Sequence, residues 1–251
     1  MTEFVTATDG VRIAWEITGE GAPILLVHGF GSDRVQNWRA PGWYDTLAKA
    51  GYSAVALDCR GHGESDKPHD TAAYGESIMV DDIALVMRAA GIRRTAIMGY
   101  SMGGSLTLQV CHRFPAQVSC AIIGGVGEVY FTRSNGWRAA IADGILADER
   151  APLSPVQKMF RNFAHQRGKD ALALAACMRS PRTPPNRDEL AAIATPALVV
   201  CGETDEVSGP AQPLAAELGN GRAVTIPRRD HMLTVGDKLY KQAVLEFLHA
   251  R

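Results

Sequence analysis

The sequence is poor in the features that mark several specialised classes of protein. It has only five cysteines in 251 residues, and no Cys-x-x-Cys pair among them, which argues against a zinc site or a thioredoxin-type motif. Cys120 and Cys201 fall in apolar runs typical of buried strands, so plain buried thiols in a reducing compartment are expected. A chain of this length needs no disulfides, because it buries roughly three quarters of its unfolded surface on folding.

Charge runs and targeting signals are equally scarce. With 26 basic and 27 acidic residues the formal net charge is −1. There is no long basic run, so no nucleic acid and no membrane surface is expected as a partner. No apolar run approaches the roughly 20 residues of a membrane span. The first residues, 1–4, lack the basic segment and apolar core of a secretory signal, so a cytoplasmic location is expected.

The chain instead alternates between short apolar runs and helical patterns, without internal repeats. Short continuous apolar runs are typical of strands buried on both faces of a parallel sheet. They occur at 24–27, 53–57, 95–98, 119–123, 197–201 and 222–226. Helical patterns occur at 43–50, 78–90, 102–114, 211–218 and 238–249, and Ser77 is the expected N-cap of the second. This alternation predicts an α/β fold with helices on both faces of a mostly parallel sheet.

Two segments depart from the alternation. Strand patterns at 4–8 and 11–18 flank Asp9-Gly10, a strong two-residue turn signal, and predict an antiparallel hairpin that brings the sheet to eight strands. Between 126 and 193 there is no strand pattern, and helical patterns at 137–146, 156–166 and 170–178 precede a proline-rich loop at 180–186. We therefore predict a core domain of residues 1–125 and 194–251, and a helical lid of residues 126–193 inserted into it.

The strongest chemical signal is the pentapeptide 99–103, Gly-Tyr-Ser-Met-Gly, between an expected strand and an expected helix. In that context Gly-x-Ser-x-Gly indicates a nucleophile elbow, a tight turn that lifts a serine hydroxyl above the sheet edge. Small residues on either side let the chain approach itself. The turn also places the backbone N–H of Met102 at a helix start, where it can stabilise an oxyanion. Ser101 is therefore the expected nucleophile.

From these residues the chain resembles the α/β-hydrolase family over nearly its whole length. The resemblance implies a triad in the chain order serine, acid, histidine. The acid of that family follows the strand after the insertion, and Asp205 stands at the matching Gly-x-x-Asp position. Glu203 and Glu206 are competitors in the same loop. A family variant with the acid after the preceding strand would use Glu128.

The resemblance also implies the histidine and the oxyanion donors. His231 is the histidine between the last expected strand and the last expected helix, and Asp230 precedes it where the family usually has glycine. The segment 28–31, His-Gly-Phe-Gly, resembles the family's His-Gly-x-Gly loop, in which the backbone N–H of the third residue is an oxyanion donor. In this chain that residue is Phe30. For His28 itself a structural hydrogen-bonding role is expected.

A further family segment is 58–65, Asp-Cys-Arg-Gly-His-Gly-Glu-Ser, which implies a structural polar turn beside the active-site end. Aromatic residues near the elbow and in the insertion are the expected substrate-binding side chains. For those in the insertion the competing role is the insertion's own small core. The set comprises Phe30, Tyr100, Trp137, Phe160 and Phe163, with Met159 also apolar in the insertion.

The function that these residues predict is a serine hydrolase, resembling carboxylesterases, that cleaves a small-molecule ester or related acyl bond without metal or cofactor. Relatives with an aspartate nucleophile, the epoxide hydrolases and haloalkane dehalogenases, are disfavoured by Ser101. The same triad also serves C–C bond hydrolases, lactonases, thioesterases and cofactor-free perhydrolases, and it is compatible with a slow-turnover ligand receptor. Fold alone does not choose between these.

Overall fold

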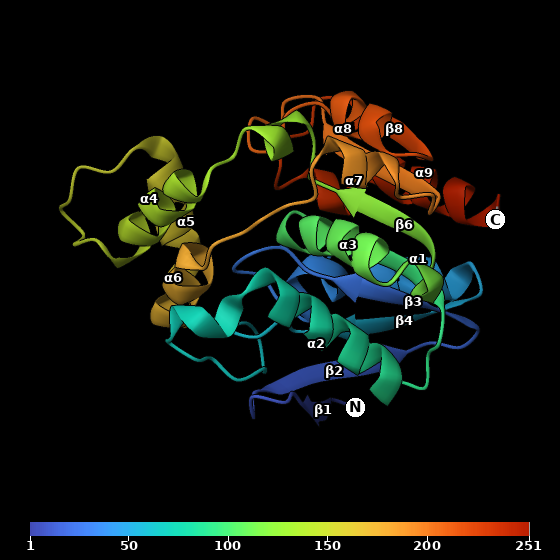
Figure 1. The fold of residues 1–251 in the computed structure, drawn as a ribbon, viewed down its shortest axis with the longest axis horizontal. Helices are drawn as coiled ribbons and strands as arrows, with labels where there is room; N and C mark the ends of the chain where they lie inside the picture. The colour runs from blue at the N-terminus through green and yellow to red at the C-terminus, as the bar shows by residue number, and fades with distance from the viewer. Residues whose placement is uncertain (251) are drawn as a thin grey trace.

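All of the expected strands are present in the computed structural model, which describes residues 1–250. They are β1 (Glu3–Thr6), β2 (Arg12–Thr18), β3 (Ala22–Val27), β4 (Tyr52–Leu57), β5 (Thr95–Tyr100), β6 (Val118–Gly124), β7 (Ala197–Gly202) and β8 (Gly221–Ile226). They form one sheet in the order β1-β2-β4-β3-β5-β6-β7-β8 (Figure 1). β2 pairs antiparallel with β1 and β4, and the other pairings are parallel. The predicted mixed sheet with an antiparallel edge is confirmed.

The turn between β1 and β2 is longer than the sequence predicts. The hairpin pairs Thr6 with Arg12, which leaves residues 7–11 in the loop. Within this loop the N–H of Gly10 donates to the carbonyl of Ala7 at 2.9 Å, and Gly10 has a φ of +85°. Glycine adopts that left-handed conformation without steric cost. Asp9-Gly10 therefore marks the turn correctly, but the expectation of a two-residue turn is wrong.

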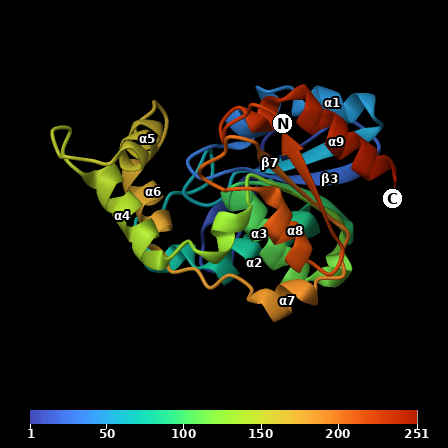
Figure 2. The same cartoon turned by 90° about the horizontal axis from the view of Figure 1, so that it is seen from above.

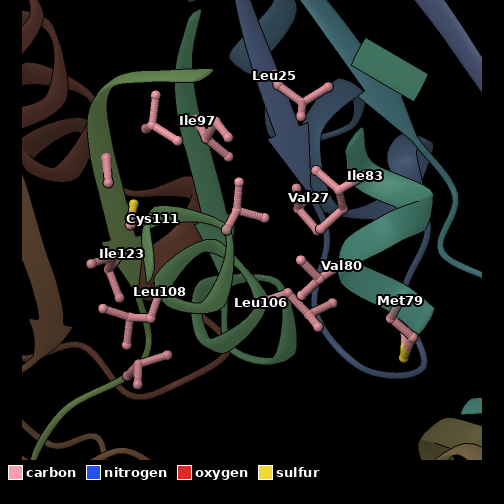
Figure 3. Packing of buried hydrophobic residues seen from close by; sticks show 14 of the residues in the cluster. Leu25, Val27, Met79, Val80, Ile83, Ile97, Leu106, Leu108, Cys111 and Ile123 are labelled. Atoms are coloured by element: carbon pink, nitrogen blue, oxygen red, sulfur yellow. The ribbon is translucent and has the colours of Figure 1, made fainter. Parts of the chain in front are cut away.

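Helices cover both faces of the sheet, as predicted (Figure 2). They are α1 (Trp43–Lys49), α2 (Glu76–Ala89), α3 (Met102–Arg113), α8 (Ala211–Glu217) and α9 (Lys238–His249). Successive residues of a strand point to opposite faces of its sheet. In β3, Leu25 and Val27 pack in the cluster with α2, α3 and α8, while Ile24 and Leu26 pack in the cluster with α1 and α9. Figure 3 shows the first of these clusters.

One helix begins earlier than expected. α2 starts at Glu76, with Gly75 as its N-cap, so Ser77 lies within the first turn and is not the cap. Gly75 has the extended ψ of 141° that opens a helix, and its carbonyl accepts the N–H of Met79 at 3.1 Å. The carboxylate of Glu76 in the first turn is favourable near the positive end of the helix dipole.

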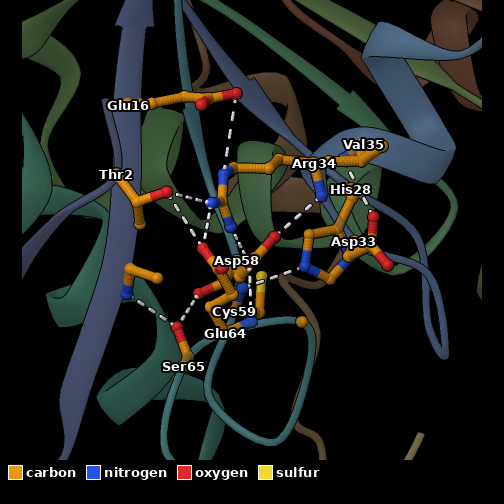
Figure 4. A network of polar contacts seen from close by, with 12 residues as sticks. Thr2, Glu16, His28, Asp33, Arg34, Val35, Asp58, Cys59, Glu64 and Ser65 are labelled. Carbon is orange, nitrogen blue, oxygen red and sulfur yellow. Dashed lines mark hydrogen bonds and ion pairs between the residues drawn. The ribbon is translucent and has the colours of Figure 1, made fainter. Parts of the chain in front are cut away.

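The polar loop 58–65 is tied to the sheet by a buried network (Figure 4). The guanidinium of Arg34 forms ion pairs with the carboxylates of Asp58 and Glu64, and Asp58 is fully buried. The hydroxyl of Ser65 donates to the carbonyl of Asp58 at 2.6 Å. Removing one partner of a buried ion pair is costly, so the pair of Arg34 with Asp58 holds the loop in place. These contacts support the structural interpretation of the loop.

Between β6 and β7 the chain forms helices that extend away from the sheet (Figure 1). They are α4 (Asn135–Leu146), α5 (Pro155–Ala164) and α6 (Ala171–Arg179), each within two residues of its predicted start and end. Ser134, Ser154 and Asp170 cap their N-termini through side-chain oxygens. The three helices share a small apolar cluster that includes Ile145 and Leu174.

A fourth helix of this segment, α7 (Arg187–Ala191), has no counterpart in the predictions. Asn186 and Glu189 form a capping box at its start. Leu190 and Ile193 pack in the main core cluster and not in the cluster of α4, α5 and α6. The chain therefore rejoins the core packing before residue 193, and the division into core and lid stays a prediction.

All five cysteine side chains are buried, as expected from the sequence. No helix within residues 1–250 is both long enough and apolar enough to cross a bilayer.

Candidate active site

Ser101 lies on a strained turn between β5 and α3. Its φ of +53° and ψ of −111° are conformations that non-glycine residues rarely adopt. The flanking glycines are required by crowding: a Cβ on Gly99 would lie 2.1 Å from the carbonyl oxygen of Gly103, and one on Gly103 would lie 2.0 Å from that of Val27. The N–H of Ser101 donates to the carbonyl of Gly124 at 2.7 Å, which anchors the turn to β6. The sequence context thus gives the geometry of a nucleophile elbow.

Three side chains from distant loops meet at this turn. The hydroxyl of Ser101 donates to Nε2 of His231 at 3.0 Å, and Nδ1 of His231 donates to Oδ2 of Asp205 at 2.8 Å. Ser101 follows β5, Asp205 follows β7, and His231 follows β8, at the carboxyl ends of parallel strands that share one edge. A nucleophile, a base and a carboxylate that orients the base are the parts of a triad.

Asp205 is buried and fully hydrogen-bonded. Its Oδ1 accepts the N–H groups of Val207 at 3.0 Å and Ser208 at 2.9 Å, and its Oδ2 accepts the Ser208 hydroxyl as well as His231. Burial alone would raise the pKa of Asp205, but the hydrogen bonds and charge of His231, with the bonds from Ser208, lower it below the ordinary value. The group is therefore held as a carboxylate facing the imidazole.

The three alternative acids lie elsewhere. Glu203 is exposed and accepts the backbone N–H of Arg228 at 2.7 Å, so it caps a turn. Glu206 and Glu128 are also exposed, and neither forms a side-chain hydrogen bond within residues 1–250. Among these carboxylates only Asp205 contacts His231.

The loop that carries His231 is fixed from two sides. The hydroxyl of Tyr100 donates to the His231 carbonyl at 2.6 Å, and the two rings lie 5.5 Å apart. Asp230, at the position where a glycine is usual, accepts the N–H groups of Met232 at 3.0 Å and Leu233 at 2.8 Å. The carboxylate therefore closes an Asx turn in this loop.

The loop 28–31 passes beside the elbow, as the expected oxyanion role requires. Asn37 accepts the N–H of Gly29 at 2.9 Å and so holds the loop from the short helix at Val35–Arg39. Within residues 1–250 the backbone N–H groups of Phe30 and Met102 have no hydrogen-bond acceptor, and both residues line a cavity with Ser101. These two donors are available for a developing negative charge.

His28 and His62 lie outside the hydrogen-bonded chain of the triad. Nδ1 of His28 donates to the carbonyl of Gly29 at 2.7 Å, and Nε2 accepts the N–H of Cys59 at 2.9 Å. Complete burial lowers the pKa of both histidines. His28 is thus a neutral hydrogen-bonding link between two loops, in agreement with the expected structural role.

Ser101 lies between two cavities. The larger one, of about 620 Å³, is also lined by His231 and by mostly apolar side chains that include Phe30, Tyr100, Met159, Phe160, Phe163 and Leu233. The smaller one, of about 120 Å³, shares Phe30, Ser101 and Phe160 with it and adds Trp137 and several polar residues. Four of the five expected substrate-binding residues thus line the larger cavity, and Trp137 lines the smaller.

The expectation that some of these aromatic side chains belong to the insertion's own core is also met. Trp137 and Phe160 pack against the apolar cluster of α4, α5 and α6, and so does Phe30 from the core side. Phe160 contacts both others, with ring centroids 5.9 Å from Phe30 and 5.8 Å from Trp137. The two roles therefore do not exclude each other, because one face of a ring packs and another lines a cavity.

Several polar residues at the site have no signal in the sequence. Ser208 holds Asp205, and Asn37 holds the loop 28–31, through contacts that only folding creates. Arg133, Arg138 and Arg182 line the smaller cavity. Arginines in a helical insertion are usually interpreted as surface residues. The periodicity of the sequence does not distinguish an arginine that points into a cavity from one that points into solvent. Within residues 1–250 no three His, Cys, Asp or Glu side chains are grouped as metal ligands.

The fold, the elbow and the order of the three loops define a class of protein, the hydrolases built on an α/β sheet. The model of the Alpha/beta hydrolase family matches residues 24–238, and the chain belongs to that family.

Relatives agree with this assignment to different extents. A putative 2-succinyl-6-hydroxy-2,4-cyclohexadiene-1-carboxylate synthase of Bacillus subtilis is 27% identical over 97% of both chains. An uncharacterized protein of Mycobacterium tuberculosis is 35% identical, but the match covers 48% of this chain and 33% of that protein. The chain thus matches only about a third of the length of that mycobacterial relative.

Solved structures share the fold over the whole chain. An esterase from Exiguobacterium antarcticum has a TM-score of 0.78 at 21% identity, covering 100% of this chain and 98% of that one. The enol-lactonase from Burkholderia xenovorans has a TM-score of 0.74 at 24% identity, covering 98% and 100%. At such identities the likeness establishes the fold alone.

Proposed function

We propose that this protein is a serine hydrolase that cleaves a carboxylic ester, or a related acyl bond, of a small molecule through an acyl-enzyme intermediate. The observation that carries the proposal is the hydrogen-bonded chain from Asp205 through His231 to Ser101, which ends on a strained elbow between two cavities. The names of its structural neighbours, an esterase and an enol-lactonase, support a small-molecule acyl substrate.

In the first half-reaction the Ser101 oxygen attacks the carbonyl carbon of the ester while Nε2 of His231 takes the hydroxyl proton. The carbonyl oxygen becomes an oxyanion that accepts the N–H groups of Phe30 and Met102. Asp205 stabilises the imidazolium and keeps the Nδ1 proton in place. The intermediate then expels the alcohol, which takes the proton from His231, and the acyl group stays on Ser101.

In the second half-reaction a water molecule replaces the alcohol. His231 removes a proton from this water as it attacks the acyl carbon, and the same two N–H groups stabilise the second oxyanion. Collapse releases the carboxylic acid and returns the proton to the Ser101 oxygen. No atom is left on the enzyme, so the cycle needs only ester and water.

We propose further that α4, α5 and α6 act as the lid over this site. α5 contributes Met159, Phe160 and Phe163 to the larger cavity, and α4 contributes Trp137 to the smaller. An apolar cover excludes water and strengthens electrostatic interactions at the reacting centre. Substrate selection would then depend mainly on residues 126–193.

The proposal is tested by assaying the purified protein against short p-nitrophenyl esters, thioesters and lactones, with covalent labelling by a fluorophosphonate. We expect multiple turnovers on at least one ester and a single label on Ser101, detected by mass spectrometry of peptides. Labelling without turnover would indicate a slow-turnover receptor. Turnover confined to thioesters or lactones would show that the substrate is not a carboxylic ester. The assignment of Ser101 as the nucleophile would remain.

The rate of ester hydrolysis should fall as the pH is lowered, and the fall should follow the protonation of a single group. His231 accepts the proton of Ser101 only as a neutral imidazole. The carboxylate of Asp205, whose pKa is lowered, is ionised well below neutral pH and so adds no second step there. The measurement is kcat/KM from about pH 5 to pH 9 on one active ester. A flat profile with Ser101 still required would contradict a histidine base.

A further inference from the structure

The smaller cavity beside Ser101 contains three arginines from the segment between β6 and β7. Arg133 precedes α4, Arg138 lies on its first turns, and Arg182 lies in the loop after α6. The three side chains line the same cavity, although Arg182 is more than forty residues from the other two in the sequence. Three cationic side chains at one small cavity repel one another, so the arrangement requires an explanation.

None of these guanidinium groups has a carboxylate partner within residues 1–250. Arg138 donates from Nη2 to the carbonyl of Cys177 at 3.0 Å, and Arg182 donates from Nη2 to the sulfur of Met79 at 3.1 Å. In the described part of the chain, residues 1–250, the Nε atoms of Arg138 and Arg182 are buried without a hydrogen-bond partner. Arg133 donates to the carbonyl of Val207. The buried donors are therefore incompletely satisfied, which is costly for charged groups.

Two further residues shape the cavity. Glu76 also lines it, but its carboxylate accepts the backbone N–H of Thr183 at 3.1 Å and is not within ion-pair distance of an arginine. Tyr130 also lines the cavity, and within residues 1–250 its hydroxyl is buried without a hydrogen-bond partner. Three guanidinium groups against one carboxylate give a net lining charge of 3 − 1 = +2. The lining of the cavity is therefore cationic.

The charge persists at neutral pH. Burial, with repulsion from Arg182, lowers the pKa of Arg138 to about 10, and burial also lowers the pKa of Arg133. Both remain protonated near pH 7. The guanidinium groups thus repel one another, and an anion in the cavity would relieve this repulsion.

We propose that the smaller cavity binds a carboxylate on the acyl portion of the substrate, so that the preferred ester is a half-ester of a dicarboxylic acid. This rests on the proposed function, and it names the substrate class of that same site. Arginine forks match the planar carboxylate and donate two hydrogen bonds to it at once. A cavity of about 120 Å³ is small compared with the roughly 300–1,000 Å³ of drug-sized ligand sites, and it suits a short acid chain.

The position of His231 decides which half of the ester carries the charge. The departing alcohol must receive its proton from Nε2 of His231, and His231 lines the larger cavity but not the smaller. The alcohol therefore occupies the larger, apolar cavity. The acyl chain extends from Ser101 past Met102 toward Arg138 and Arg182.

Two esters with the same alcohol test the inference. Monobutyl succinate has a free carboxylate that is ionised at neutral pH, and butyl levulinate replaces that carboxylate by a methyl ketone of similar size and shape. Release of butanol is followed by gas chromatography, which avoids aryl half-esters that cleave themselves through a cyclic anhydride. We expect kcat/KM for the succinate half-ester to exceed that for the levulinate by at least about tenfold, from charge-assisted hydrogen bonds.

Substitution of the arginines should remove the preference. In Arg138→Gln and in Arg182→Gln the ratio of the two kcat/KM values should fall by about 10- to 100-fold, while Arg138→Lys should keep part of it. The matched control is Arg179→Gln, on α6, because Arg179 is exposed at the surface of the same insertion and pairs with Asp143 at 2.6 Å. Its ratio should equal that of the native protein.

Thermal unfolding separates a binding role from a structural one. Loss of an unpaired buried charge should leave the melting temperature of Arg138→Gln equal to or above that of the native protein, whereas a structural arginine would lower it. Equal kcat/KM values for the two esters, or an unchanged ratio in both variants, would overturn the inference and leave the proposed hydrolase intact. Absence of hydrolysis of every ester, with no labelling of Ser101, would overturn both.

Discussion

Replacing Ser101 by alanine should abolish turnover of every ester that the native protein hydrolyses, with kcat lowered about 10⁴- to 10⁶-fold. The reason is chemical, since alanine has no oxygen to attack the carbonyl carbon. Labelling by the fluorophosphonate should disappear as well. The measurement is kcat on one active ester, supported by intact-protein mass after labelling.

The fold of this variant should survive. Among residues 1–250 the side chain of Ser101 makes one hydrogen bond, to His231, and the bond from its backbone N–H to Gly124 is unaffected by the substitution. Circular dichroism and the melting temperature should therefore match the native protein. Ser77→Ala, at an exposed position of α2, is the control serine and should retain full activity. Most of the native rate in Ser101→Ala would refute the nucleophile assignment.

Asp205→Asn should lower kcat by roughly 10³- to 10⁴-fold, the order seen when a triad acid is neutralised. The amide is close in shape to the carboxylate, but it does not stabilise the imidazolium. It also offers an N–H to Nδ1 of His231, which favours the wrong tautomer. The measurement is kcat on the same active ester, with circular dichroism to confirm folding.

Three glutamates provide matched controls for this experiment. Glu203→Gln, Glu206→Gln and Glu128→Gln each remove one carboxylate from a position that competes with Asp205 in the sequence, and all three are exposed. Each should keep nearly the native rate. If Glu128→Gln lost most of its activity while Asp205→Asn kept nearly the native kcat, the triad acid would be the one that follows β6. The proposed roles of Ser101 and His231 would still stand.

The sequence predicts some helices, strands and turns of this fold better than others, for physical reasons. Runs such as Ile24 to Val27 predict strands, because a strand between two helical layers is apolar on both faces and this pattern is visible without knowledge of its neighbours. Asp9-Gly10 predicts the turn but not its length, because the pairing of Thr6 with Arg12 is a property of two strands together. The sequence does not predict helix α7, because its five residues carry too little periodicity.

The sequence by itself determined the elbow. Gly99 is needed by a contact within the elbow itself, because a Cβ there would lie 2.1 Å from the carbonyl oxygen of Gly103. The Gly-x-Ser-x-Gly pattern around Ser101 is therefore visible locally, although Gly103 is needed by the carbonyl of Val27 on β3. It also determined the order of the three chemical loops, since each follows its own apolar run. For Asp205 the sequence offered a family position, and two glutamates stood within two residues of it.

Only the tertiary structure decided which groups meet. Contact between Asp205 and His231 depends on two loops that follow different strands, and a hydrogen bond at 2.8 Å requires both loops to have fixed paths. The cationic cavity has the same origin, because Arg138 and Arg182 lie on opposite sides of α6 in the chain and converge only when the insertion folds. Local patterns report which residues are buried or turn the chain. Long-range contacts are set by the packing of the whole sheet and its helices, and no local pattern contains them.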